Sequence, residues 1–131
     1  MFQIPNSILN DGGKGALNHA RLRMGLSALN AHRKKYNFIS FNDCPKCGQK
    51  PENEVHYLLK CPDLVAHRAV LMGTISPLLE RRVEISLPPI THAEQTKLVS
   101  ILLYGSPDLS VEDNKVLFES VRAFIEQSNR F

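Results

Sequence analysis

This chain of 131 residues contains no tryptophan and only three cysteines. Three thiols cannot all pair with one another, which argues against a secreted disulfide scaffold and leaves metal binding or free thiols. The longest apolar run, 98–104, is too short to span a bilayer, and residues 1–5 lack the basic start and apolar run of a signal peptide. We therefore expect an intracellular protein, nuclear or cytoplasmic, that does not enter a membrane.

Acidic residues are missing from a long stretch near the N-terminus. No Asp or Glu occurs from residue 12 to residue 42, although the whole chain has 13 acidic and 16 basic residues. This asymmetry is typical of a protein with a polyanionic partner. The basic residues of the stretch are Lys14, Arg21, Arg23, Arg33, Lys34 and Lys35.

The spacing of apolar residues predicts a mostly α-helical fold made of several short helices. Residues 37–43 are either a short strand or an apolar lead-in to the cysteines. Ser76 and Pro77 are expected to close a helix, because proline disrupts a helix interior. Thr91 and Glu94 form a capping box, and other helices begin at Ser27 and Ser110. The expected helices cover 16–24, 27–36, 51–60, 63–75, 91–104 and 110–127.

The length fits one domain, with or without an arm. Turn-forming residues near the N-terminus predict an irregular arm, and the remainder divides by charge and by the position of the cysteines. The last segment is expected to pack with the one before it as a single domain. The four segments are an arm over 1–13, a basic helical segment over 14–37, a zinc-binding segment over 38–62 and a helical region over 63–131.

The three cysteines and one histidine have the spacing of a zinc site. Cys44, Cys47, His56 and Cys61 follow the pattern Cys-x2-Cys-x8-His-x4-Cys, and all three cysteines fall within eighteen residues. Two cysteines separated by two residues can bind one ion from a single turn, and Gly48 lets the chain fold back afterwards. We therefore predict a Cys3His site for one Zn²⁺. Four protein ligands leave no position for water, so the predicted role of the ion is structural rather than catalytic.

The step from His56 to Cys61 constrains the local structure. Five residues of a continuous α-helix turn through about 500°, which leaves about 140° between the two side chains. We therefore expect the helix to end near Lys60, so that Cys61 can turn toward the metal. The alternatives are that His67 is the fourth ligand, or that these residues are buried thiols and an ordinary histidine. His19, His32 and His92 are interpreted as surface or core histidines.

Several segments together resemble the C-terminal zinc-binding (Cys-Cys-His-Cys) segment of non-LTR retrotransposon reverse transcriptases. The zinc segment carries the most specific part of the likeness, and the likeness extends over almost the whole chain. The residues that carry it are 22–32, 36–38, 44–48 and 54–62, with a weaker tail match at 102–105, Asn114, 124–125 and 130–131.

The resemblance implies a polymerase domain upstream in an intact element, and contact of the zinc segment with RNA or DNA. It transfers the four ligands and no catalytic residue, since no Tyr/Phe-x-Asp-Asp motif occurs here. The chain is accordingly expected to be a fragment or a stand-alone remnant of such an element. Asp108 and Asp113 superficially fit a nuclease pattern, but the gap between them is too short, and we expect no enzyme.

The predicted function is a zinc-stabilised nucleic-acid-binding module derived from such a polyprotein. The alternative is a structural or protein-interaction zinc module, which would carry an exposed apolar patch. Tyr36 and Phe38 can stack on unpaired bases or belong to the core, and the cations can bind phosphates or form a solvated face. The candidate nucleic-acid contacts are Arg21, Arg23, Arg33, Lys34, Lys35, Tyr36 and Lys46.

Overall fold

The computed structural model describes residues 13–131, so nearly all of the expected arm lies outside the described residues. Over this range the structure is helical, without a strand, and the mostly α-helical prediction is confirmed. Residues 37–43 are irregular, which excludes the short strand considered for them. The elements are α2 (Gly13–Met24), α3 (Asn30–Lys35), the π-helix η1 (His56–Lys60), the 3₁₀ turn η2 (Pro62–Leu64), α4 (Val65–Arg82), α5 (His92–Tyr104) and α6 (Val111–Ser128).

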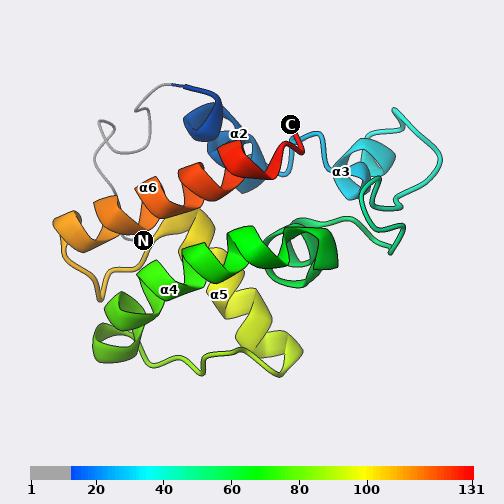
Figure 1. Cartoon of the computed structure of the whole chain (residues 1–131). Helices are drawn as coiled ribbons and strands as arrows, with labels where there is room; N and C mark the ends of the chain where they lie inside the picture. The colour runs from blue at the N-terminus through cyan, green and yellow to red at the C-terminus, as the bar shows by residue number, and fades with distance from the viewer. Residues whose placement is uncertain (1–12) are drawn as a thin grey trace.

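Helix α6 is the central element of the body of the protein (Figure 1). It packs against α2, α4 and α5. The apolar stripe that the sequence predicted, Leu117, Val121, Phe124 and Ile125, is buried. Each such side chain contributes about 1.5–3 kcal/mol of burial free energy. This stripe therefore provides much of the stability of the four-helix body.

The predicted caps are present where helices α5 and α6 begin. The Thr91 hydroxyl accepts a hydrogen bond from the Glu94 N–H at 3.1 Å, and Ser110 accepts one from the Asp113 N–H at 3.0 Å. The Glu94 carboxylate accepts from the N–H of Ile90, one residue before the position that a standard capping box predicts. These bonds satisfy N–H groups that have no partner within the helix.

Helix α4 is longer than predicted, and the expected closure at Ser76 and Pro77 is wrong. The helix continues through Pro77 to Arg82. Leu71, Ile75 and Leu79 are all buried, so one apolar stripe runs past the proline and packs on α6. Burial along this stripe outweighs the roughly 3 kcal/mol that an interior proline costs.

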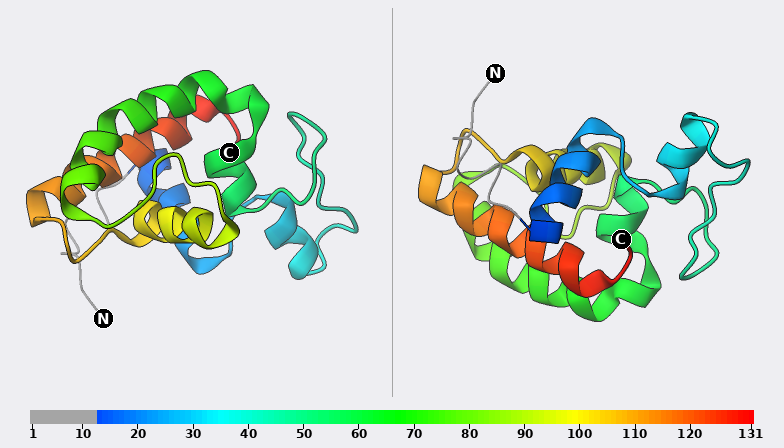
Figure 2. Two further views of the ribbon diagram at one scale, coloured as in Figure 1. Left: turned by 90° about the horizontal axis from the view of Figure 1, so that it is seen from below. Right: turned by 90° about the horizontal axis from the view of Figure 1, so that it is seen from above.

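Residues 30–55 form a lobe that projects from one end of the helical body (Figure 1, Figure 2). It contains α3 and the irregular segment that carries the first two cysteines. Between residues 38 and 55, only Cys44 and Glu52 are buried. The lobe therefore has almost no apolar core, and other interactions must hold it in shape.

A search of the described helices for a membrane-spanning segment found none that is long and apolar enough.

Candidate metal centre

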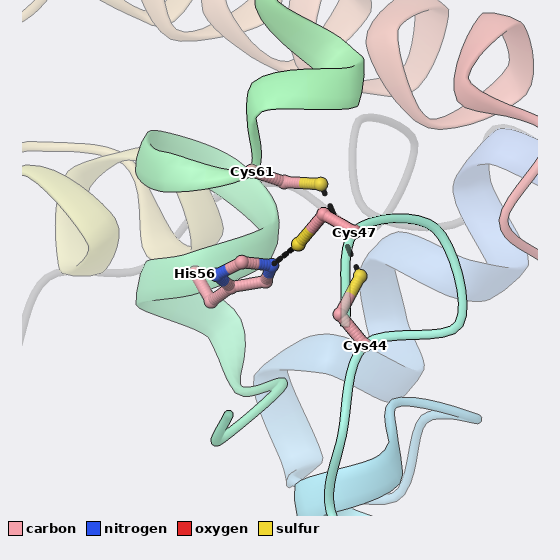
Figure 3. Close-up of side chains that lie close together, drawn as sticks. All are labelled: Cys44, Cys47, His56 and Cys61. Atoms are coloured by element: carbon pink, nitrogen blue, oxygen red, sulfur yellow. Dashed lines mark hydrogen bonds between the residues drawn. The ribbon is translucent and has the colours of Figure 1, made fainter. Parts of the chain in front are cut away.

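The four predicted ligands come together where the lobe meets the body (Figure 3). One ligand atom from each of Cys44, Cys47, His56 and Cys61 lies within 4.8 Å of the others. The Cys44 and Cys61 sulfurs are 3.9 Å apart, and the Cys47 sulfur is 3.4 Å from His56 Nε2. A tetrahedral ion with metal–sulfur bonds of about 2.3 Å places its ligand atoms about 3.5–3.8 Å apart. The cluster therefore has the dimensions of a four-coordinate metal site.

The first two ligands lie on a tight turn of the lobe. The Cys44 N–H donates to the Gln49 carbonyl at 2.7 Å, and the Gly48 N–H donates to the Cys44 carbonyl at 2.8 Å. Gly48 has φ of 78°, a left-handed conformation that a side chain would strain. This glycine closes the turn as the sequence predicted, so that both thiols face the same point.

The other two ligands are brought together by a π-helix. In η1 the Cys61 N–H donates to the His56 carbonyl at 2.8 Å, an i to i+5 bond that directly links the two ligand residues. This wider turn places residue i+5 nearly above residue i, which removes most of the 140° separation that an α-helix would impose. The helix ends at Lys60, as predicted, and a sequence pattern based on α-helical geometry does not reveal the π-turn.

Burial shifts the pKa of three of the four candidate ligands, Cys44, His56 and Cys61. It raises the pKa of the Cys61 thiol to about 12, against a hydrogen bond from the Asp63 backbone, and it also raises the pKa of Cys44. Burial lowers the pKa of His56, so its imidazole is neutral and able to ligate. A divalent cation at the centre would reverse the balance for the thiols, because it stabilises thiolates directly.

His67, the rival fourth ligand, is not part of the cluster. It lies in α4 and lines a groove that this helix forms with α6. Of the other histidines, His19 and His32 are buried and His92 is exposed, consistent with their interpretation as core and surface residues.

Helix α3 is fastened by hydrogen bonds to the segment that carries the first two cysteines. The Asn30 side chain donates to the Asp43 carbonyl at 2.6 Å, and its N–H donates to the Glu52 carboxylate at 2.8 Å. The Ala31 N–H donates to the Glu52 carbonyl at 3.0 Å. These contacts make α3 and the cysteine turn one unit, so the position of the α3 cations depends on the order of the metal segment.

A buried ion pair connects the lobe to the C-terminal end of α6. Arg130 donates to the Glu52 carboxylate with Nε at 2.5 Å and a second nitrogen at 2.6 Å, and it also reaches the Ala28 carbonyl. Glu52 is 1% exposed. In the sequence, Glu52 is only the second residue of the helix expected over 51–60. Its partner is 78 residues away, and no local pattern signals such a pair.

The candidate nucleic-acid contacts fall into two groups. Arg21, Arg33, Lys34 and Lys35 are exposed, Tyr36 is 45% exposed, and Lys46 is half-buried. Arg23 is different, because its Nε donates to the Leu103 carbonyl at 2.8 Å and its guanidinium lies 5.9 Å from the centre of the Phe118 ring. Burial lowers the pKa of Arg23. The Arg23 guanidinium therefore interacts with groups of the helical body, and it does not contribute to the exposed surface of the lobe.

A serine, a histidine and a carboxylate also lie in line beside α3. The Ser27 hydroxyl is 2.8 Å from His32 Nδ1, and His32 Nε2 contacts the Glu54 carboxylate. Ser27 is buried, and its oxygen accepts from the Leu29 N–H while its own N–H donates to His32. The sequence pattern did not bring these residues together. Because the hydroxyl is enclosed and its bonds are used locally, the chain of contacts holds the loop before α3 in place. The expected helix start at Ser27 is wrong: α3 begins at Asn30, and its N-cap residue Leu29 has no side chain that can accept a capping bond.

The two carboxylates weighed for nuclease activity lie in a turn and in the first turn of the helix that follows it. Asp113 lies in the first turn of α6, where its N–H is capped by Ser110. Next to it, the buried Asn114 side chain donates to the carbonyls of Ser106, Leu109 and Ser110. The residues around Asp108 therefore form a turn held by Asn114.

Comparisons of the chain with protein-family models, curated proteins and solved structures found no significant match. The metal cluster and the surface around it are accordingly the observations on which a function can be argued.

Proposed function

We propose that the Cys3His cluster holds one structural Zn²⁺ and that the lobe above it binds nucleic acid without catalysis. Three thiolates and one imidazole are a ligand set typical of zinc, and a closed set of four leaves no open coordination position. The proposal is carried by one observation: the cluster lies at the base of a lobe whose exposed charges are mainly positive.

The exposed charge of the lobe is mainly positive because most of its acidic side chains contact other side chains of the protein. Glu52 pairs with Arg130, and Glu54 contacts His32. The remaining acidic residue of the lobe is Asp43. The basic residues of the lobe are Arg33, Lys34, Lys35, Lys46 and Lys50. Such a surface attracts phosphates and releases their counterions on binding.

The metal is tested on the purified chain. Elemental analysis should find one zinc per protein, and a Cys61→Ser variant should lose it together with part of the helical circular dichroism. Chains purified with no bound metal, and unable to take up zinc, would contradict this part of the proposal.

Nucleic-acid binding is tested by fluorescence anisotropy at two ionic strengths. The affinity for labelled RNA and DNA should fall steeply between about 50 and about 200 mM salt. Reversal of Arg33, Lys34 and Lys35 to glutamate should abolish binding. Reversal of Arg81 and Arg82, exposed at the far end of α4, is a control for the change in net charge, although it reverses two charges rather than three, and it should change binding little.

A second outcome corresponds to the alternative function. If neither nucleic acid binds at low salt, the protein is better described as a structural or interaction module. Exposed apolar side chains at Leu17, Met24 and Leu26 favour that alternative. The resemblance to the zinc segment of retrotransposon reverse transcriptases supports nucleic-acid binding, and we propose that origin on the motif residues alone.

A further inference from the structure

Three aromatic rings of the lobe are left in solvent. Tyr36 is 45% exposed, Phe38 76% and Phe41 53%, whereas Tyr57, Phe118 and Phe124 in the body are buried. This excludes the core position considered for Tyr36 and Phe38. Exposed aromatic side chains on a segment with little core indicate a binding surface rather than a folding nucleus.

The backbone places one of these aromatic residues directly after the helix end that carries the cations. Asn37 has φ of 63°, and the Phe38 N–H donates to the Arg33 carbonyl at 2.9 Å while the Asn37 N–H donates to the Lys34 carbonyl at 3.0 Å. This pair of bonds is a Schellman motif, in which the chain turns back over the last turn of the helix. The backbone of Phe38 therefore lies against the last turn of α3, which carries Arg33. Next to it, the Lys35 ammonium lies 5.7 Å from the centre of the Tyr36 ring.

Deepening the proposed function, on which this inference rests, we propose that the lobe binds single-stranded nucleic acid. Unpaired bases stack on Phe38 and Phe41, and Arg33 and Lys34 bind the adjacent phosphates. Stacking suits any base, so the expected recognition tolerates different sequences.

A duplex is a poor fit to this surface. Its base faces are covered by their neighbours, so exposed rings gain no stacking unless the strands separate. Helix α3 has six residues and is about 9 Å long, and its first turn is held inside the lobe by the buried Asn30 and His32. Helices that read the major groove use residues near their N-terminus. Helix α3 instead presents cations at its C-terminal end.

An anionic membrane also attracts cations and aromatic rings, but the polar residues of this segment favour nucleic acid. The exposed Asn37 and Ser40 alternate with the aromatic residues, as does the half-buried Asn42. Amides and hydroxyls supply the donors and acceptors that base edges require, whereas a bilayer core offers no partner for them.

The test compares one labelled strand of about 12 nucleotides, alone and annealed to its complement, on the metal-loaded full chain. The single strand should bind more tightly than the duplex. The double variant Phe38→Ala and Phe41→Ala should weaken single-strand binding by about 5- to 150-fold for each lost stack, with little effect on the duplex. Phe38→Tyr, which keeps a stacking face, should retain affinity.

Ile90→Ala is the control, since Ile90 is as exposed as Phe38 but lies in the linker before α5. It should bind as the wild type does. Circular dichroism and zinc content should be unchanged in all of these variants, because the replaced side chains lie in solvent.

Each other result has a distinct meaning. Equal binding of strand and duplex, unaffected by loss of the rings, would overturn this inference and leave the proposed function intact. No binding of either at low salt would overturn the proposed function itself. Binding to phosphatidylserine vesicles in place of the oligonucleotides, lost in the aromatic variant, would assign the surface to a membrane and overturn both.

Discussion

The imidazole of His19 is enclosed in the body of the protein. Its Nε2–H donates to the Leu102 carbonyl at 2.9 Å, and its ring meets Phe118 edge-on at 4.9 Å. Burial, together with the charges of Arg23 and Arg122, lowers the pKa of His19 from 6.5 to about 3. The folded protein therefore keeps this ring neutral at pH values where an exposed histidine is charged.

This burial predicts a specific loss of stability in acid. Between pH 6.5 and about 3 the unfolded chain binds a proton that the folded chain excludes, so stability falls as the pH falls through this window. From about pH 7 to about pH 5, His19 should remove on the order of 2 kcal/mol from the free energy of unfolding. In His19→Gln, which keeps a donor for Leu102, that part of the decline should be absent in urea titrations.

His92→Gln, at an exposed position, is the control. Its free energy of unfolding should decline with falling pH as that of the wild type does. Both variants carry the same metal cluster, so acid effects on the ligands cancel in the comparison. An identical pH dependence of His19→Gln and wild type would contradict the assignment.

Glycine has opposite functions in two helices of this fold. Gly25 ends α2 with φ of 68°, where the Leu26 N–H donates to the Arg21 carbonyl at 2.9 Å. Gly73 lies inside α4 in an exposed, helical position. A Cβ added at either glycine would meet no atom within 4 Å, so packing does not distinguish them. Backbone conformation alone decides the effect of a side chain at these two positions.

The same substitution should therefore change stability in opposite directions. Gly73→Ala should stabilise the protein by about 0.5–1 kcal/mol, because alanine loses less conformational entropy in a helix. Gly25→Ala should destabilise it by about 1–2 kcal/mol, because a left-handed backbone is strained by a Cβ. Thermal unfolding of the two variants measures both effects, and a shift of the same sign in both would refute the argument.

Two sets of contacts join the lobe to the helical body. One is the metal cluster, with two ligands from the lobe and two from the π-helix and its end. The other is the ion pair of Glu52 with Arg130. Few apolar side chains of the lobe are buried, whereas the body is held by hydrophobic packing. With a metal bound at the cluster, as we propose, most of the order of the lobe would depend on these polar and metal contacts.

Removal of the metal should consequently unfold the lobe before the body. In hydrogen exchange followed by mass spectrometry, a chelator should strip protection from the lobe, residues 30–55, and α6 should stay protected. Added zinc should restore the protection. Cys47→Ser should exchange in the same pattern without a chelator. Unchanged protection after complete loss of zinc would show that the cluster is not structural.

Local patterns were sufficient for much of the site and for several elements. The spacing of Cys44, Cys47, His56 and Cys61 predicted the ligand cluster, because chelation by a tight turn depends on residues close in the chain. Thr91 and the apolar stripe of α6 were predicted for the same reason. A cap acts within one turn, and an amphipathic stripe repeats with the helical period.

The remaining features depend on contacts between distant segments, which no local pattern encodes. The stripe of α4 packs on α6 strongly enough to carry the helix through Pro77, and the fold directs Arg23 into the body. Glu52 meets Arg130 because α6 ends beside the lobe. The exposure of Phe38 follows from the irregular path of the lobe, which offers no apolar surface to cover the ring. Burial and long-range pairing are properties of the assembled chain, since they depend on which surfaces meet in three dimensions.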